Sequence, residues 1–154
     1  MDKMINYLSI SSRQIIWQTG KDFFNNYSHH ENETVRVVPF INNMANAYAA
    51  SDLVISRAGA ITCSELTVCG KPSILIPYPA AAGNHQEKNA NALADNGASI
   101  IINEDKIIPD ELASLIQNLL NNNKQLNEMA NSSKKLGKPD ATAIIVQQAL
   151  ELVK

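Results

Sequence analysis

The stretch from residue 53 to residue 70 holds the residues of this chain that are best suited to bind an anion. An apolar run, Leu53-Val54-Ile55, predicts a buried strand, and Arg57-Ala58-Gly59 ends it with a turn. Residues 60–69 then predict a helix that Gly70 can close in a left-handed cap. The first N–H groups of a helix lack intrahelical partners and carry partial positive charge. A strand, a glycine turn and a helix start therefore predict a phosphate site.

Glu65 lies one turn inside this predicted helix and is the only charged residue between Arg57 and Lys71. A carboxylate can accept hydrogen bonds from both hydroxyls of a sugar diol, so a phosphate site beside Glu65 suggests a nucleotide. The alternative role of Glu65 is to complement the helix dipole. The residues alone therefore indicate an α/β protein that binds a nucleotide or a phosphate.

Other well-known nucleotide and metal motifs are incomplete in this sequence. Residues 57–62 contain one glycine where a dinucleotide fingerprint needs several, so no nicotinamide or flavin cofactor is expected. Gly70-Lys71 is followed by Pro72 and lacks the upstream glycine of a P-loop. No acidic pair resembles a two-metal site, and Cys63 and Cys69 have no companion pair. We therefore expect no cofactor and no metal.

The composition is that of a soluble globular domain. Of 154 residues, 45% are hydrophobic and 18% are charged, which argues against disorder. A net charge of −2 argues against a nucleic-acid partner, because such proteins usually carry a basic stripe. No apolar run approaches the roughly 18 residues of a membrane span, and the first residues lack a signal-peptide pattern. We expect a cytoplasmic protein without a membrane span.

Predicted strands and helices alternate along the chain. The strands are expected at 14–18, 34–38, 53–56, 73–76 and 98–102, and the helices at 21–27, from Asn42 or Asn43 through Tyr48, at 60–69, 85–96, 109–120 and 126–136, and from Asp140. This pattern predicts one Rossmann-like parallel sheet with helices on both faces, in a single α/β domain covering residues 1–154. Ligands of such sheets bind at the carboxyl ends of the strands, so function is expected in the loops 18–20, 39–44, 56–60, 77–84 and 103–108.

Several motifs, in order along the chain, resemble those of one glycosyltransferase family. They are Gln18-Thr19-Gly20-Lys21, the residues V-P-F-I-N-N-M at 38–44, R-A-G-A-I-T-C-S-E at 57–65, G-K-P-S at 70–73 and N-H-Q-E-K-N-A at 84–90. From Gln14 to the final helix, the chain resembles the C-terminal domain of the MurG family. This resemblance implies the C-terminal half of a GT-B glycosyltransferase, which moves GlcNAc from UDP-GlcNAc to the lipid-linked muramyl-pentapeptide of peptidoglycan synthesis.

The resemblance implies that the loop after the second strand binds uracil. Phe40 and Ile41 would flank the base, with the backbone of Ile41 reading its edge, and Met44 would lie nearby. Phe40 has an alternative role, because a phenylalanine at the end of a strand can instead plug the core below it.

The resemblance also implies that the diphosphate lies at the helix start. Ala60, Ile61 and Thr62 would face it, after a turn that needs Gly59. Glu65 would accept hydrogen bonds from both ribose hydroxyls, a charge-assisted contact worth about 2 kcal/mol. Arg57 is counted among the binding residues, although we favour for it a structural role in which it pairs with a carboxylate.

The sugar of the donor is assigned to the start of the next helix. The resemblance implies that His85 and Gln86 reach the GlcNAc hydroxyls and that Asn89 supports their loop. The alternative for His85 is an ordinary residue at a helix start.

The chain departs from the family pattern at its beginning. Family members start with an N-terminal domain that supplies the acceptor loops, the membrane-facing surface and the proposed general base, and that domain is missing from this sequence. We therefore expect no catalytic residue here, contact with the lipid-linked acceptor only through the missing domain, and no transferase activity of the fragment alone. The full-length enzyme is expected to be peripheral on the inner face of the cell membrane.

Two other functions fit the same residues. One is the donor-binding domain of a lipid glycosyltransferase that uses another UDP-sugar, since the loop with His85 and Gln86 would decide the sugar. The other is a non-catalytic sugar-nucleotide-binding subunit of a two-chain transferase, which the fold alone does not exclude.

Overall fold

The computed structural model describes residues 13–153, in which strands and helices alternate as the sequence predicts. Within these residues the chain divides into two compact units. Unit 1 comprises residues 13–51 and 105–123, and unit 2 comprises residues 52–104 and 124–153. The assignment of the chain to a single domain stays a prediction.

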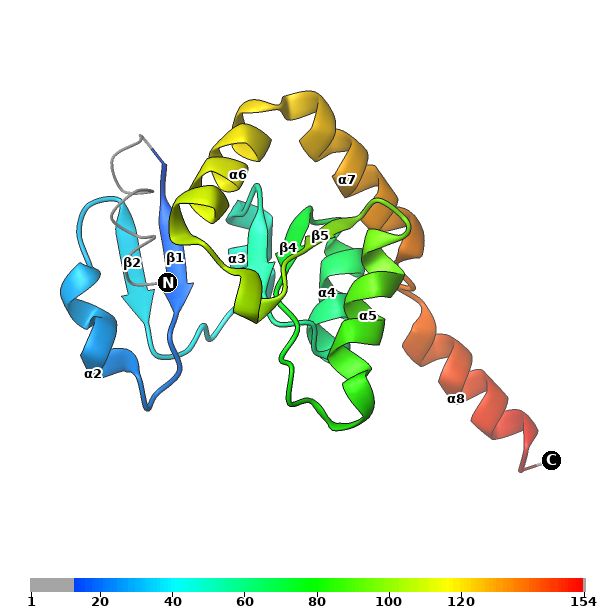
Figure 1. Ribbon diagram of the computed structural model, residues 1–154. Coiled ribbons are helices and arrows are strands. Elements are labelled where there is room, and N and C mark those ends of the chain that lie inside the picture. The colour runs from blue at the N-terminus through cyan, green and yellow to red at the C-terminus, as the bar shows by residue number, and fades with distance from the viewer. Residues whose placement is uncertain (1–12, 154) are drawn as a thin grey trace. The chain divides into compact units, whose positions relative to one another are not determined.

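Unit 1 contains two parallel strands, β1 (Ile15–Gln18) and β2 (Val35–Val38), joined through α2 (Phe24–Tyr27) and the 3-10 turn η1 (Ser28–His30) (Figure 1). The predicted helix at 21–27 is therefore shorter than expected. Buried Trp17 packs against Tyr27, with ring centroids 4.8 Å apart and ring planes tilted by 37°. The core of these elements is formed by Trp17, Val35 and Val37, with Ile15, Phe24 and Tyr27 packed against them.

Two further helices belong to unit 1. The helix α3 (Met44–Ala50) begins after Asn43, whose side chain accepts a hydrogen bond from the N–H of Asn46 at 3.0 Å, as a residue with N-cap preference should. The helix α6 (Pro109–Asn121) has proline in its first turn and buries one apolar stripe, as predicted from its periodicity. The buried residues of that stripe are Leu112, Ala113, Ile116 and Leu119.

Unit 2 is built on a parallel sheet of order β3-β4-β5, with β3 at Val54–Ser56, β4 at Ser73–Leu75 and β5 at Ser99–Ile101. All of β4 is buried, as its continuous apolar run predicts for a central parallel strand. The helices α4 (Ala60–Cys69) and α5 (His85–Ala94) follow β3 and β4 and lie side by side (Figure 1). The loop before α5 includes the 3-10 turn η2 (Ala82–Asn84), and η3 (Glu104–Lys106) follows β5.

The C-terminal end of α4 is fixed by α7 (Asn123–Leu136). Gly70 caps α4 in the left-handed conformation, with φ 62°, as predicted. The buried hydroxyl of Ser133 on α7 donates to the carbonyl of Leu66 at 3.1 Å. A Cβ added to Gly137 would lie 2.7 Å from the Thr67 carbonyl oxygen, so only glycine permits this close approach. Packing against α7 and the residues after it therefore fixes the C-terminal end of α4, and the turn after β3 positions its N-terminal end.

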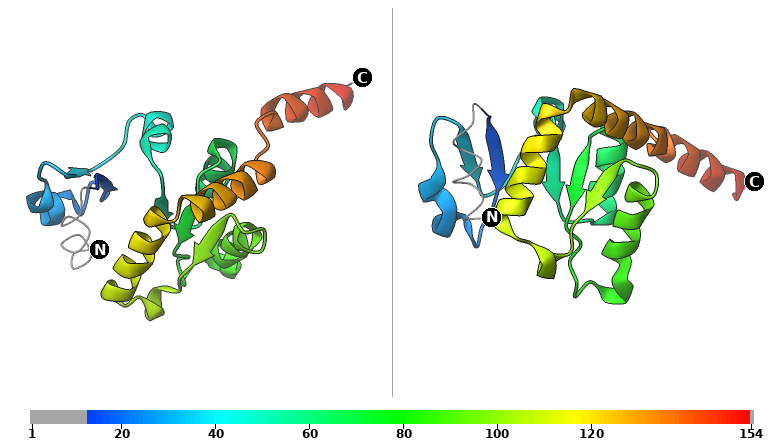
Figure 2. Two further views of the ribbon diagram at one scale, coloured as in Figure 1. Left: turned by 90° about the horizontal axis from the view of Figure 1, so that it is seen from above. Right: turned by 45° about the horizontal axis from the view of Figure 1, so that its top comes forward.

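The last helix, α8 (Ala141–Glu151), has no buried residue, and it leads away from the sheet of unit 2 (Figure 2). The connection between α6 and α7 is shorter than the gap between the predicted helices at 109–120 and 126–136, since α6 ends at Asn121 and α7 begins at Asn123. Within residues 13–153, no helix combines the length and the apolar character needed to cross a membrane.

The strands form two parallel sheets rather than the one sheet that the alternation suggests. Among the described residues, β1 pairs with β2, and β3, β4 and β5 form a separate sheet. Alternating strands and helices predict parallel strand direction, because crossovers require it, but they do not specify which strands are neighbours. The α/β class with parallel strands and covering helices is confirmed.

Candidate functional site

The N-terminal end of α4 is open and lies at the carboxyl end of β3. Its first intrahelical hydrogen bond runs from the N–H of Cys63 to the carbonyl of Gly59, at 2.9 Å. The N–H groups of Ala60, Ile61 and Thr62 precede that bond and have no intrahelical acceptor. No side chain caps this end, and Ile61 is 76% exposed. The predicted anion site therefore has its donors accessible.

The expectation that the turn requires Gly59 is wrong. Gly59 has φ −65° and ψ 150°, an extended conformation that any residue adopts. A Cβ built on it would meet only the Thr62 hydroxyl, at 3.8 Å. The missing side chain therefore serves no need of the fold, and it leaves the backbone at the start of α4 approachable.

Glu65 lies half-buried on α4, one turn beyond these N–H groups. Its neighbours Cys63, Leu66 and Thr67 are buried, so their face of α4 packs inward, while Glu65 is only half-buried. Burial raises the pKa of the Cys63 thiol, which keeps it protonated and unreactive. Of Cys63 and Glu65, Glu65 is therefore the residue suited to bind a ligand.

Arg57 pairs with a carboxylate, the structural role that the sequence analysis favours for it. Its Nη2 donates to Oε1 of Glu104 at 2.7 Å, and its Nη1 donates to Oε2 at 3.1 Å. The Arg57 hydrogen bond lowers the pKa of Glu104 below its ordinary value. The carboxylate therefore stays charged opposite the guanidinium, and the partner of Arg57 is Glu104.

The first turns of α5 face the loops that follow β3 and β4. The amide of Asn89 donates to the carbonyl of Ala58 at 3.1 Å, and Oε1 of Gln86 accepts from the N–H of Tyr78 at 3.0 Å. Nδ1 of His85 lies 2.6 Å from the Ala82 carbonyl, which can only accept, so Nδ1 carries the proton. Nε2 of His85 is then the ring nitrogen that can accept from a ligand.

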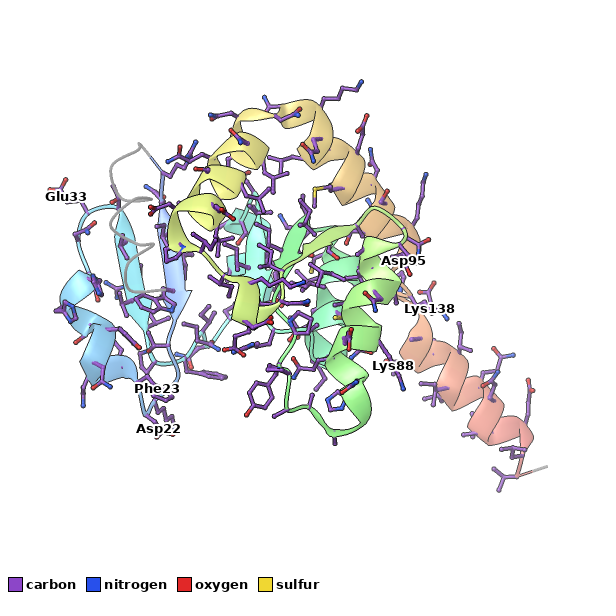
Figure 3. All side chains as sticks on the ribbon, viewed as in Figure 1. Asp22, Phe23, Glu33, Lys88, Asp95 and Lys138 are labelled. Carbon is purple, nitrogen blue, oxygen red and sulfur yellow. The ribbon has the colours of Figure 1, made fainter. Side chains whose placement is uncertain are left out.

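Phe40, Ile41 and Met44 belong to unit 1, and the other predicted site residues belong to unit 2. Phe40 is 58% exposed, so the alternative in which it plugs the core is wrong. Phe23, in the connection after β1, is also exposed (Figure 3). The N–H of Ile41 donates to Oε1 of Gln18 at 2.8 Å, which leaves the Ile41 carbonyl as its backbone group for a base edge.

Three residues that the sequence analysis did not assign take part in these contacts. They are Gln18, Tyr78 and Glu104. The available signal was position, because each lies in or beside a loop at the carboxyl end of a predicted strand. Their partners lie between 8 and 47 residues away in the chain, and no periodic pattern reports such a pairing.

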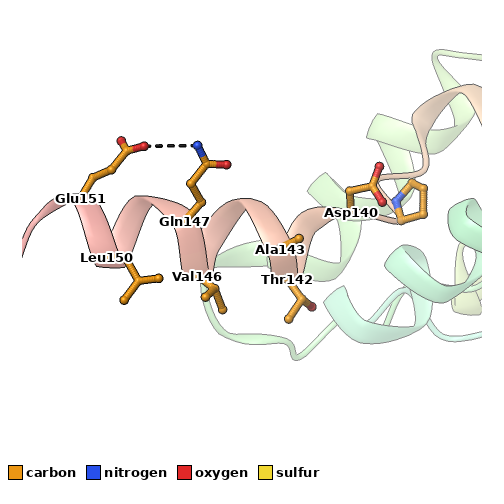
Figure 4. Close-up of a pocket in the computed structure, with 8 residues that line it drawn as sticks. Asp140, Thr142, Ala143, Val146, Gln147, Leu150 and Glu151 are labelled. Carbon is orange, nitrogen blue, oxygen red and sulfur yellow. Dashed lines mark hydrogen bonds between the residues drawn. The ribbon is translucent and has the colours of Figure 1, made fainter.

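A shallow hollow runs along α8 and is lined only by residues between Pro139 and Glu151 (Figure 4). It is the open side of one exposed helix and has no wall from the sheet, so it is not a candidate for the nucleotide. Within residues 13–153, no group of three or more His, Cys, Asp or Glu side chains is arranged to hold a metal ion.

Comparison with known proteins points to one family. The model of the glycosyltransferase family 28 C-terminal domain matches residues 3–145. A protein of Desulforamulus reducens is 46% identical over 130 residues, covering 84% of this chain and 34% of the relative. One of Christiangramia forsetii is 43% identical over 140 residues, covering 91% and 38%. Both are named UDP-N-acetylglucosamine–N-acetylmuramyl-(pentapeptide) pyrophosphoryl-undecaprenol N-acetylglucosamine transferase.

The fold agrees with that of a solved relative. The crystal structure of MurG from Acinetobacter baumannii matches with a TM-score of 0.84 at 31% identity, covering 96% of this chain and 46% of that chain. This chain thus spans less than half the length of the relatives that it matches. The motifs, the fold and the comparisons agree. The chain belongs to the glycosyltransferase family 28 C-terminal domain family.

Proposed function

We propose that this chain binds UDP-GlcNAc as the donor half of an inverting glycosyltransferase that adds GlcNAc to the lipid-linked muramyl-pentapeptide. The observation that carries this proposal is the open start of α4. There the N–H groups of Ala60, Ile61 and Thr62 lack intrahelical acceptors, and Glu65 follows one turn later. The names of the relatives support the choice of donor and acceptor.

The proposed chemistry uses α4 to stabilise the leaving group. An acceptor hydroxyl attacks the anomeric carbon of GlcNAc, the bond from that carbon to the diphosphate oxygen breaks, and UDP departs with its electron pair. The acceptor proton goes to a general base that we place outside this chain. Backbone N–H groups and the helix dipole face the charge that grows on the diphosphate, and they need no reorganisation during the step.

The contacts in the structure refine the proposed role of each binding residue. Glu65 accepts from the ribose hydroxyls, and Phe40, Ile41 and Met44 serve the base. Since Oε1 of Gln86 is occupied by Tyr78, its NH2 group is the one that donates to a sugar hydroxyl, and His85 offers Nε2 as an acceptor. Asn89 and Arg57 hold the surrounding loops, since Asn89 donates to the carbonyl of Ala58 after β3 and Arg57 donates to the carbonyl of Pro77 after β4.

The whole enzyme is proposed to work at the inner face of the cell membrane. Its lipid-linked acceptor is bound there, and this chain contributes the donor site. We expect the chain on its own to bind the donor without transferring the sugar.

Binding of nucleotides to the 154-residue chain tests the proposal. UDP-GlcNAc and UDP should raise the melting temperature by mass action, UDP-glucose should do so less, and AMP should not. Glu65→Gln keeps the size of the side chain and removes its charge, so it should weaken UDP-GlcNAc binding by roughly tenfold. The assignment would be overturned if the wild-type chain did not bind UDP, or if Glu65→Gln bound UDP-GlcNAc as tightly as the wild type does. A stronger effect of UDP-glucose would point to a different UDP-sugar.

A further inference from the structure

We infer that Glu104 is a positioning residue of the donor site. Acting through Arg57, it holds the turn at 57–59 and the loop at 76–86 in the arrangement that nucleotide binding requires. This inference rests on the proposed function, because it assumes that the donor binds at the start of α4.

One guanidinium connects the carboxyl ends of all the strands in the β3-β4-β5 sheet. Arg57 itself follows β3, and its Nη1 donates to the carbonyls of Ile76 and Pro77 after β4, each at 3.3 Å. Both of its terminal nitrogens reach Glu104 after β5, at 2.7 and 3.1 Å. The planar fork of arginine matches a carboxylate in this bidentate way, and the pair fixes the orientation of the guanidinium.

The loop after β4 is held by the same pair. The guanidinium carbon of Arg57 lies 5.4 Å from the centre of the Tyr78 ring, a distance at which the cation is attracted to the ring. The N–H of Tyr78 in turn donates to Gln86 at 3.0 Å. Glu104 therefore acts on Gln86, a proposed sugar ligand, through two intermediate residues.

The turn before α4 is held from both sides. Asn89 donates to the carbonyl of Ala58, and Arg57 is the residue just before it. A guanidinium that turned away from Glu104 would release the chain next to Gly59, where the open N–H groups of α4 begin. Small shifts of binding groups reduce ligand affinity strongly, because the geometry of the site is what the ligand recognises.

The pair has little to contribute to stability. The side chains of Arg57 and Glu104 are 45% and 42% exposed, and exposed ion pairs contribute little to the free energy of unfolding. A positioning role and a purely structural role therefore predict different results. Loss of the pair should lower affinity for the nucleotide while leaving the melting temperature almost unchanged.

The test compares Glu104→Gln with a matched control in the 154-residue chain. Glu31 forms an exposed pair with Arg36 at 2.6 Å, so Glu31→Gln removes a similar ion pair within unit 1, whereas the loops held by Glu104 belong to unit 2. Calorimetric titration with UDP-GlcNAc should give roughly tenfold weaker binding for Glu104→Gln and unchanged binding for Glu31→Gln. Both variants should melt within about 2 °C of the wild type.

Two further readouts separate the positioning role from a purely structural one. In Glu104→Gln, the amide NMR signals of Tyr78 and Gln86 should shift, and in Glu31→Gln they should not. Arg57→Lys keeps the charge but loses the fork, so it should weaken binding as much as Glu104→Gln does, and the double variant should be no worse than either.

Unchanged binding by Glu104→Gln would overturn the inference, since the pair would then have no effect on the site. Tighter binding would overturn it as well, since Glu104 would then be holding Arg57 away from the ligand. Additive losses in the double variant would overturn it as well. Failure of the proposed function looks different, because the wild-type chain would then not bind UDP-GlcNAc, or Glu65→Gln would bind it as the wild type does.

Discussion

The side-chain amide of Asn89 donates a hydrogen bond to the backbone carbonyl of Ala58, 3.1 Å away. Ala58 is fully buried and precedes Gly59, the residue that caps α4. Asn89 therefore ties α5 to the residue before the open helix start. The family resemblance implies that Asn89 supports the loop around His85, whereas its hydrogen bond in the structure goes to the turn after β3.

Replacing Asn89 with alanine should weaken both the fold and the binding of the donor. The buried carbonyl of Ala58 loses its partner, which costs about 1 kcal/mol in the free energy of unfolding, and the turn before α4 loses a tie. Urea denaturation and titration with UDP measure the two effects. Asn91→Ala is the control, because this exposed residue lies on the same helix and gains the same helix propensity. Equal stability of the two variants would show that the bond to Ala58 has no role.

Gly59→Ala should separate binding from folding. The backbone conformation of Gly59 suits alanine and a Cβ has room, so the free energy of unfolding should change by less than about 1 kcal/mol. The new methyl group covers the backbone at the start of α4, so we expect roughly tenfold weaker binding of UDP. Melting curves with and without UDP check both parts.

Gly70→Ala provides the opposite case. Gly70 has φ 62°, and its added Cβ would lie 3.2 Å from Cβ of Lys134, so this variant should lose about 1 kcal/mol of stability or more. It lies at the far end of α4 and should keep its affinity for UDP. A Gly59→Ala variant that binds as well as Gly70→Ala does would show that the ligand does not approach this turn.

Local features of the fold could be predicted from the sequence, and long-range pairings could not. The apolar run at 73–76, the left-handed cap at Gly70 and a helix start at Asn42 or Asn43 all follow from residue types over a few positions. The structure confirms them and selects Asn43 as the N-cap. The pairing of Arg57 with Glu104 joins residues 47 positions apart. Its partner could not be named in advance, because any carboxylate in the strand-end loops satisfies the same local pattern.

The division of the strands between two sheets is a second feature that local patterns do not encode. Strand periodicity reports burial, and the alternation with helices reports direction. Neither specifies whether the strand at 35–38 or the strand at 73–75 lies beside the strand at 54–56. The open start of α4 could be predicted because it depends on local residues alone: the helix begins without a capping side chain.

The Arg57–Glu104 pair should make stability depend on pH in a defined direction. The hydrogen bond from Arg57 lowers the pKa of Glu104 below the ordinary value of 4.5. The folded state therefore holds the proton less tightly than the unfolded state does. The contribution of the pair is complete above the unfolded pKa and disappears as the pH falls through the folded pKa. In Glu104→Gln this contribution is absent at every pH.

Urea denaturation of both proteins between about pH 7 and about pH 3 measures that difference. Wild type should be slightly more stable than Glu104→Gln at neutral pH, and the two should converge below pH 4.5 as the carboxylate takes up a proton. The gap at neutral pH should shrink in high salt, because the pair is exposed and ions screen it. A constant gap across the whole range would mean that Glu104 affects the fold through its shape and not through its charge, and the bidentate pair would then be no more than a surface contact.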